Sequence, residues 1–147
     1  MPMIPTGELP LKNYHMPLKE KHIYILDDDE SVLRSLKILM VSYGFAVDTF
    51  SFAEEFFKAV PNSAIGCLIL DIHMPGINGW DTQQRLTKTG YKLPVIIITA
   101  DKDEYFKDLA FKAGAVGFLQ KPFEDHYLLH MVTQVFDKTA GHNEKNK

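Results

Sequence analysis

Short apolar runs alternate along the chain with segments in which apolar residues recur at helical spacing. Each apolar run has the length of a strand and precedes one amphipathic segment, so the pattern predicts β-α units in series. The predicted strands are residues 22–26, 46–50, 67–70, 95–98 and 116–120, and the predicted helices are residues 30–43, 51–60, 80–89, 103–113 and 123–138. Such a series favours a parallel sheet with helices on both faces, which is the doubly wound α/β architecture.

Boundary residues support the predicted helices. Gly44, Gly90 and Gly114 each follow a helical segment, where glycine commonly ends a helix. Asp29 precedes the first helix and is expected to cap it, and residues 51–54 (Ser-Phe-Ala-Glu) have the capping-box pattern. The apolar residues predicted to face the core are Val32, Leu36, Leu39 and Tyr43 in the first helix, Phe106, Leu109 and Ala113 in the fourth, and Leu128, Val132, Val135 and Phe136 in the last.

The two ends of the chain lack this periodicity. Residues 1–21 are punctuated by prolines and are predicted to be an extension, residues 139–147 to be a polar tail, and residues 22–138 to form one domain. The chain does not open with a basic segment followed by an apolar one, as a signal peptide does. No apolar run approaches the roughly 20 residues that span a bilayer. We therefore expect a cytoplasmic protein without a membrane partner.

Charge and cysteine content narrow the function classes. The formal net charge is −3, which provides no basic face for DNA or RNA, so direct nucleic-acid binding by this chain is not expected. Cys67 is the one cysteine and lies in an apolar run. It cannot form an intramolecular disulfide. We expect Cys67 to be a small buried hydrophobic residue and the protein to lie in a reducing compartment.

Polar residues follow four of the predicted strands at the point where each strand ends. They are Asp27, Asp28 and Asp29 after the first strand, Asp71 after the third, Thr99 after the fourth and Lys121 after the fifth. In doubly wound sheets, ligands bind outside these carboxyl ends. Carboxylates that lie close together repel one another, and Mg²⁺ relieves the repulsion by binding oxygen ligands. A carboxylate nucleophile, Mg²⁺, a lysine and a hydroxyl together predict a phosphoryl-transfer site.

Taken one at a time, these residues have simpler interpretations. An aspartate after a strand often caps the next helix, threonine is common in strands, and Lys121-Pro122 has the composition of a turn. Their joint position at strand ends favours a site. His126 and His130 have the spacing of two metal ligands on a helix, but no third ligand is evident, so a solvated helix face is expected.

At the strand ends the chain resembles the receiver domains of two-component response regulators. The resemblance covers about residues 22–138 and rests on residues 23–29 (IYILDDD), 68–76 (LILDIHMPG) with Gly79, 93–100 (LPVIIITA) and 112–123 (KAGAVGFLQKPF). It implies a flavodoxin-like (βα)5 fold with strand order 2-1-3-4-5. The FixJ-type branch is the most similar, and its members usually carry a LuxR-type DNA-binding domain after the receiver. This chain stops about where that domain would begin, so we expect a stand-alone receiver or an excised part of a longer regulator.

The resemblance implies a metal site and an acceptor. Asp71 would be the phospho-acceptor and a Mg²⁺ ligand. Asp28 would bind Mg²⁺ directly and Asp27 directly or through water, and the backbone carbonyl of His73 would complete the protein's share of the metal shell.

The resemblance also implies the residues that respond to phosphorylation. Thr99 would bind a phosphoryl oxygen on activation, and Lys121 would pair with the acceptor carboxylate or the phosphoryl group, with a cis bond to Pro122. Phe118 would be the aromatic switch, whose rotamer follows Thr99.

The implied function is a signalling switch. A sensor histidine kinase or a phosphotransfer protein would donate a phosphoryl group to Asp71, and the receiver would assist only its own phosphorylation and dephosphorylation. Output, including homodimer formation, would use the face of the fourth helix, fifth strand and fifth helix. The aromatic residues there are expected to be mostly core with some exposed anchors: Tyr105, Phe106, Phe111, Phe118, Phe123 and Tyr127.

Two other functions share parts of this pattern. Phosphatases of the HAD type also use a phosphorylated aspartate, but they have a D-x-D motif, and residues 71–73 here are Asp-Ile-His. A pseudo-receiver that no longer accepts phosphate usually lacks an acidic residue or the lysine, whereas this chain retains Asp28, Asp71, Thr99 and Lys121. Both are therefore disfavoured.

Overall fold

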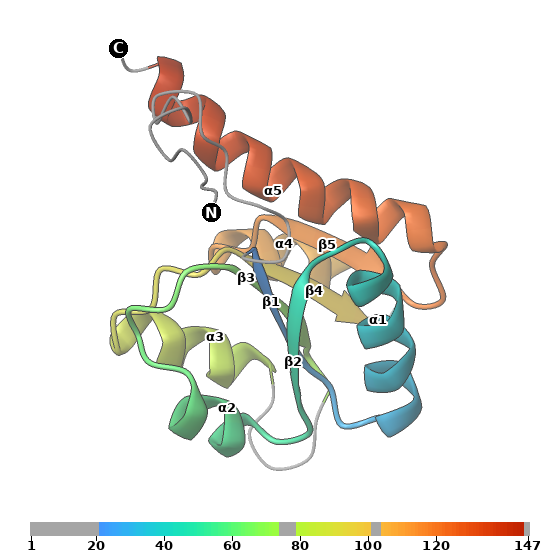
Figure 1. The fold of residues 1–147 in the computed structure, drawn as a ribbon. Helices are drawn as coiled ribbons and strands as arrows, with labels where there is room; N and C mark the ends of the chain where they lie inside the picture. Colours follow the sequence, from blue (N-terminus) through green and yellow to red (C-terminus); the bar gives the residue numbers. More distant parts are fainter. Residues whose placement is uncertain (1–20, 74–78, 101–103, 146–147) are drawn as a thin grey trace, which may run out of the picture.

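The described residues form a single parallel sheet with the strand order β2-β1-β3-β4-β5 (Figure 1). The computed structural model describes residues 21–73, 79–100 and 104–145, with side chains described up to residue 138. The strands are β1 (His22–Leu26), β2 (Ala46–Phe50), β3 (Cys67–Asp71), β4 (Val95–Thr99) and β5 (Gly117–Gln120), and the helices are α1 (Glu30–Ser42), α2 (Ala53–Ala59), α3 (Gly79–Lys88), α4 (Glu104–Lys112) and α5 (Asp125–Lys145). The predicted doubly wound fold with strand order 2-1-3-4-5 is confirmed.

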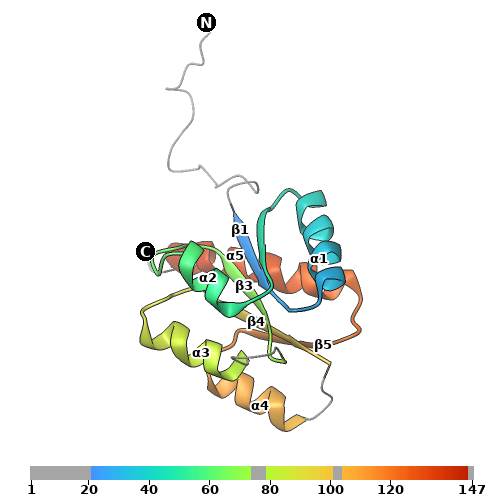
Figure 2. The same ribbon diagram turned by 90° about the horizontal axis from the view of Figure 1, so that it is seen from below.

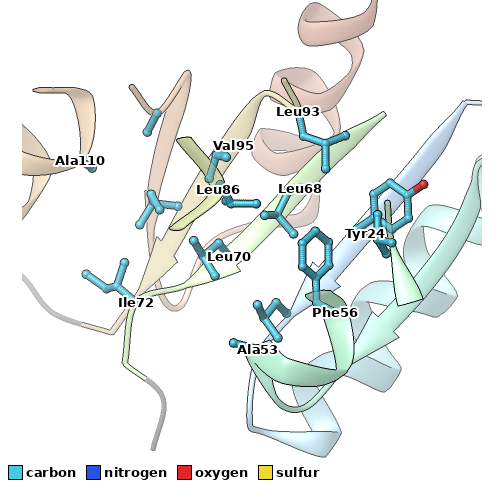
Figure 3. Close-up of a cluster of buried hydrophobic side chains, with 14 residues drawn as sticks. Tyr24, Ala53, Phe56, Leu68, Leu70, Ile72, Leu86, Leu93, Val95 and Ala110 are labelled. Atoms are coloured by element: carbon cyan, nitrogen blue, oxygen red, sulfur yellow. The ribbon is translucent and has the colours of Figure 1, made fainter. Parts of the chain in front are cut away.

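Helices cover both faces of the sheet, with α1 and α5 on one face and α2, α3 and α4 on the other (Figure 2). Alternate residues of β3 enter two separate apolar cores, because successive side chains of a strand point to opposite faces. Leu68 and Leu70 pack with α2, α3 and α4 (Figure 3), and Cys67 and Ile69 pack with α1 and α5. Every residue of β3 and β4 is buried, as expected for strands covered on both faces.

Cys67 is a packing residue, as predicted. Its thiol is fully buried, and this burial raises its pKa to about 12. A thiol that stays protonated is a poor nucleophile and a poor metal ligand.

Two helices match their predicted core faces only in part. In α1, Leu36 is buried as predicted and Val32 and Leu39 pack partly buried against the core, but Leu33 and Met40 are also buried and Tyr43 is exposed. In α4, Phe106 packs partly buried against the core as predicted, whereas the fully buried residue is Ala110 and Ala113 is exposed. The predicted face of α5 is confirmed, with Leu128 and Val132 fully buried.

The helix starts confirm one predicted cap and correct the other. Asp29 caps α1, since its Oδ1 accepts hydrogen bonds from the backbone N–H groups of Ser31 at 2.9 Å and Val32 at 3.3 Å. The capping box at residues 51–54 is wrong: α2 begins at Ala53 without a side-chain cap. The Ser51 hydroxyl instead donates to Glu30 on α1 at 3.2 Å, and the Ser51 N–H donates to Glu55 at 3.3 Å.

The last helix continues beyond its predicted end at Lys138 to Lys145, so the segment predicted as a polar tail is helical over most of its length. The predicted extension up to residue 20 and the predicted loop at residues 74–78 lie outside the described residues. Among the helices that are described, none is both long and apolar enough to cross a bilayer.

Candidate functional site

Four strands end at one edge of the sheet and bring the predicted site residues to that edge. Asp27 and Asp28 directly follow β1, Asp71 ends β3, Thr99 ends β4 and Lys121 follows β5. Parallel pairing sets this arrangement, because β3 lies between β1 and β4, and β4 pairs with β5. All five residues therefore meet at the carboxyl edge of the sheet, where ligands of doubly wound folds bind.

Three carboxylates form the acidic part of the site. One oxygen each from Asp27, Asp28 and Asp71 lies within 4.8 Å of the others. Asp27 is fully buried and Asp71 is almost so, whereas Asp28 is exposed. This is the one group of three potential metal-ligating side chains found among the residues that the structure describes.

Lys121 supplies the positive charge. Its Nζ lies 2.8 Å from Oδ2 of Asp27 and 3.8 Å from Oδ2 of Asp71. The shorter contact is to the more buried carboxylate, which has the greater need of a partner because a buried charge is costly when unpaired. Asp27 is held from its other side as well, since its Oδ1 accepts a hydrogen bond from the backbone N–H of Asp29 at 2.9 Å. The peptide bond between Lys121 and Pro122 is cis, as predicted.

Asp71 sits in an environment that disfavours its charge. Burial, followed by the negative charge of Asp27, raises the pKa of Asp71 to about 6. The backbone N–H of His73 donates a hydrogen bond to Oδ1 of Asp71 at 3.2 Å and, together with Lys121, opposes part of this increase. The carboxylate is thus positioned by its own loop while its negative charge remains poorly compensated.

Thr99 and Phe118 occupy neighbouring strands beside the acidic cluster. Thr99 is fully buried, and its backbone carbonyl accepts a hydrogen bond from the N–H of Lys121 at 2.7 Å. Phe118 pairs in register with Ile97 and packs partly buried against the core under α2, α3 and α4. The main chain thereby links the ends of β4 and β5, the two strands that carry the predicted response residues.

Three aromatic side chains, which the sequence did not single out as a set, adjoin the site. The ring of Phe106 on α4 lies edge-on to the ring of His73, with centroids 6.0 Å apart. The Phe106 ring also stacks on Trp80 of α3, with centroids 5.9 Å apart and an interplanar angle of 20°. Residue spacing along one helix cannot reveal this contact, because it joins two helices and a loop. Trp80 is consequently placed to report on events near Asp71.

The donor set fits a hard divalent cation. Three aspartates and one lysine leave an excess of negative charge when the carboxylates are ionised, and Mg²⁺ prefers carboxylate and carbonyl oxygens. His73 follows Asp71 by two residues, and its backbone is fixed by the hydrogen bond to Asp71. The cluster contains no cysteine and no histidine side chain of the kind that zinc sites favour.

Two other sequence patterns, a histidine pair and a set of aromatic residues, include exposed side chains. His126 and His130 are exposed on α5, as predicted, and His126 Nδ1 lies 3.3 Å from Oε1 of Glu124. Among the six aromatic residues of the predicted output face, half are exposed: Tyr105, Phe111 and Tyr127. The expectation that most of them belong to the core is therefore wrong, although Phe106, Phe118 and Phe123 are partly buried.

A groove of about 290 Å³ runs beside Lys121, between α1 and the loop that leads into α5. It is lined by Ser31, Val32, Ser35 and Leu36 of α1 and by Lys121, Pro122, Phe123 and Asp125. The groove thus places an accessible surface directly against the lysine of the site.

Comparisons with known proteins agree with this geometry. A family model described as the response regulator receiver domain matches residues 23–133. The response regulator protein TodT of Pseudomonas putida is 45% identical over 115 residues, which are 78% of this chain and 51% of TodT. The transcriptional regulatory protein FixJ of Bradyrhizobium diazoefficiens is 40% identical over 111 residues, which are 76% of this chain and 54% of FixJ. The chain spans about half the length of these curated relatives.

A solved structure shows that the likeness to response regulators extends to the fold. The crystal structure of full-length FixJ from B. japonicum superposes with a TM-score of 0.76 at 36% sequence identity, covering 86% of this chain and 62% of that one. The likeness to FixJ that the sequence suggested is therefore found in both sequence and fold.

Proposed function

This chain belongs to the response regulator receiver family, and we propose that it is a phosphorelay switch in which Asp71 accepts a phosphoryl group from a sensor histidine kinase or a phosphotransfer protein. Members of the family are signalling switches rather than enzymes with an external substrate. The observation that carries the proposal is the convergence of the Asp27, Asp28 and Asp71 carboxylates with the Lys121 ammonium group. We place the protein in the cytoplasm, where such donors act.

Mg²⁺ is the proposed cofactor. Asp27, Asp28, Asp71 and the backbone carbonyl of His73 would hold it, with Asp27 acting directly or through water. When bound, Mg²⁺ neutralises negative charge on the carboxylates and on phosphoryl oxygens. The clustering of three carboxylates, two of which share the single Lys121, supports this assignment.

The chemistry of transfer falls to Asp71. A carboxylate oxygen of Asp71 attacks the phosphorus of the donor phosphohistidine, a P–O bond forms, the P–N bond breaks, and the electron pair stays on the imidazole nitrogen of the donor. Lys121 donates a hydrogen bond to a phosphoryl oxygen, and the Thr99 hydroxyl donates another when the switch closes. Hydrolysis of the acyl phosphate by water returns Asp71 to its free state. These residues assist only the domain's own phosphorylation and dephosphorylation.

The donor protein would dock on the groove beside Lys121. The groove is bordered by α1 and by the loop into α5, and Val32, Leu36 and Phe123 give it apolar surface. A partner seated there would bring its phosphohistidine to the edge of the sheet at which Asp71 lies.

Output would use the face formed by α4, β5 and α5. Phosphorylation adds negative charge where Thr99 and Lys121 can close upon it, and Phe118 on β5 would follow Thr99. The exposed side chains of Tyr105, Phe111 and Tyr127 provide anchors for a homodimer or a partner on this face.

The proposal is tested by intact-mass measurement after incubation with Mg²⁺ and acetyl phosphate. We expect a single phosphoryl adduct that requires Mg²⁺, disappears in Asp71→Asn and persists in Asp29→Asn, since asparagine also caps helices. Absence of the adduct from the wild type under these conditions would refute phosphoryl acceptance and favour a pure interaction module.

A further inference from the structure

Phe106 on α4 contacts the chain on both sides of the loop that follows Asp71. Its ring lies edge-on to the ring of His73, with centroids 6.0 Å apart, and stacks on the ring of Trp80 at 5.9 Å. His73 comes two residues after Asp71, and Trp80 is the second residue of α3, which lies beside α4 (Figure 2). One side chain of α4 therefore contacts the chain both before and after this loop.

A backbone hydrogen bond closes the same loop. The N–H of Gly79 donates to the carbonyl of Ile72 at 3.0 Å, and a Cβ at Gly79 would lie 2.4 Å from Cα of Ile72. Ile72 directly precedes His73 and is buried. The bond brings the start of α3 against the residue next to His73, so that one ring on α4 can contact both His73 and Trp80.

His73 is restrained from two directions. Its N–H donates to Oδ1 of Asp71 at 3.2 Å, and its side chain contacts the Phe106 ring. These two contacts restrain its Cα, and hence the point from which its backbone carbonyl extends. Metal sites depend on neighbouring groups that hold each ligand in place, and loss of such a group weakens metal binding. The Phe106 ring is in the position to act in this way on the His73 carbonyl.

The series of ring contacts continues to the exposed face of α4. Tyr105 is 64% exposed, and its ring centroid lies 6.3 Å from that of Phe106, at an interplanar angle of 51°. Phe106 itself is partly buried and packs with Trp80 against the core under α2, α3 and α4. Chains of packed side chains can carry energetic coupling between separate sites. The contacts from Tyr105 through Phe106 to His73 thus join the surface of α4 to the backbone beside Asp71.

We propose that Phe106 is a positioning residue of the Mg²⁺ site, that it acts through His73, and that it couples the Mg²⁺ affinity to the surface of α4. This inference rests on the proposed function, because it takes the His73 carbonyl as a Mg²⁺ ligand. Loss of the ring leaves the three clustered carboxylates in place but releases His73, so that Mg²⁺ binds more weakly. Coupling is reciprocal, so Mg²⁺ also changes the surroundings of Tyr105.

Mg²⁺ titrations of the full chain test the proposal through binding rather than through phosphorylation. The affinity is measured from NMR shifts of the ¹⁵N-labelled chain, and the backbone amides of His73 and Tyr105 are followed. Phe106→Leu keeps an apolar side chain but removes the ring, whereas Phe106→Tyr keeps the ring. Phe111→Leu is the matched control, because Phe111 lies on the same helix, is 45% exposed and takes part in none of the ring contacts found among the described residues.

We expect Phe106→Leu to weaken Mg²⁺ binding by about tenfold, which is typical of losing a group that orients a metal ligand. Phe106→Tyr and Phe111→Leu should bind like the wild type. His73→Ala should weaken binding as much as Phe106→Leu, and the double variant should be no weaker than either, because both substitutions remove the same contact. Mg²⁺ should shift the Tyr105 amide signal in the wild type, and this shift should be smaller in Phe106→Leu.

Equal weakening by Phe106→Leu and Phe111→Leu would overturn the proposal, and so would additive losses in the double variant, because the effect would then not pass through His73. Unchanged Mg²⁺ affinity in Phe106→Leu, in a protein whose wild type forms the Mg²⁺-dependent phosphoryl adduct, would overturn this inference and leave the proposed function intact. A wild type that binds no Mg²⁺ would overturn both.

The exposed position 73 decides the matter if Phe106→Leu does not fold. His73→Phe keeps a ring against Phe106 and should bind Mg²⁺ like the wild type, whereas His73→Ala should bind about tenfold more weakly. Equal Mg²⁺ affinities of these two variants would overturn the proposal.

Discussion

Lys121 Nζ lies 2.8 Å from Oδ2 of Asp27, a residue 94 positions earlier in the chain. This ion pair joins the ends of β5 and β1, which are not neighbours in the sheet, since β3 and β4 lie between them. The side chain of Asp27 is fully buried and that of Lys121 is 22% exposed. The pair is therefore both a tertiary link and the main compensation for a buried charge.

Removing the lysine should destabilise the fold. We expect Lys121→Met to lower the free energy of unfolding by about 2–4 kcal/mol near neutral pH, because the buried Asp27 carboxylate would lose its partner. Urea unfolding, followed by Trp80 fluorescence, measures this change. The matched substitution Lys107→Met, at an exposed position of α4, should change the value by less than about 0.5 kcal/mol. Equal effects of the two substitutions would show that the ion pair contributes little.

The raised pKa of Asp71 predicts a pH-dependent cost. In the folded chain its pKa is about 6, well above the ordinary value of this carboxyl. The folded state therefore holds the proton more tightly, so stability falls as pH rises through the window between the two values. Without metal, Asp71→Asn should raise the free energy of unfolding by on the order of 2–3 kcal/mol near pH 8 and by about half as much near pH 5.

Urea unfolding in the presence of a chelator at both pH values tests this prediction. Exposed Asp28, for which the same substitution to asparagine is available, provides the comparison. If the gain in Asp71→Asn were independent of pH, the charge of Asp71 would not be its source.

Mg²⁺ should stabilise the fold through the acidic cluster. A ligand that binds only the folded state adds about 2.7 kcal/mol when present at about a hundred times its dissociation constant. We expect MgCl₂ to raise the melting temperature of the wild type and to have a much smaller effect on Asp28→Asn. Asp29→Asn should respond like the wild type, because Asp29 caps α1 and is not one of the clustered carboxylates. An equal loss of the Mg²⁺ response in both variants would contradict the assigned site.

Gly79 should be required for the geometry near Asp71. A Cβ atom at this position would lie 2.4 Å from Cα of Ile72, and the N–H of Gly79 donates to the Ile72 carbonyl at 3.0 Å. We expect Gly79→Ala to destabilise the fold by about 1–3 kcal/mol and to slow phosphorylation by acetyl phosphate, because the backbone next to Asp71 must shift. Intact-mass time courses measure the rate.

Gly114→Ala separates crowding from backbone strain in that test. Gly114 has a positive φ of 103°, but a Cβ there would meet no atom within 4 Å. Gly114→Ala should therefore lower the free energy of unfolding through backbone strain without slowing phosphorylation. A similar loss of rate in both variants would indicate that general destabilisation, rather than the position of Ile72, is responsible.

The sequence predicts the fold well because its strands are short, apolar and separated by clear helix ends. It predicts the buried face of α1 only in part, because apolar residues surround that helix. Leu33 and Met40 are buried, Val32 and Leu39 are partly buried, and Ile38 is exposed. Helical spacing cannot select one face when several are apolar, so contact with the sheet decides.

The sequence also predicts which residues meet at the candidate site, but not how their side chains pair. Polar residues at strand ends must share an edge once the sheet is parallel, and this places Asp27, Asp71 and Lys121 together. Which carboxylate Lys121 pairs with depends on side-chain reach and relative burial, and these emerge only on folding.

Reductive trapping of the acyl phosphate identifies the residue that accepts the phosphoryl group. The wild type is incubated with Mg²⁺ and acetyl phosphate, treated with borohydride, which reduces an aspartyl phosphate to homoserine, and mapped by peptide mass spectrometry. We expect homoserine at position 71 and unmodified Asp27 and Asp28. Homoserine at position 27 or 28 with Asp71 intact would contradict it, and so would a phosphoryl group found on a histidine, serine or threonine instead.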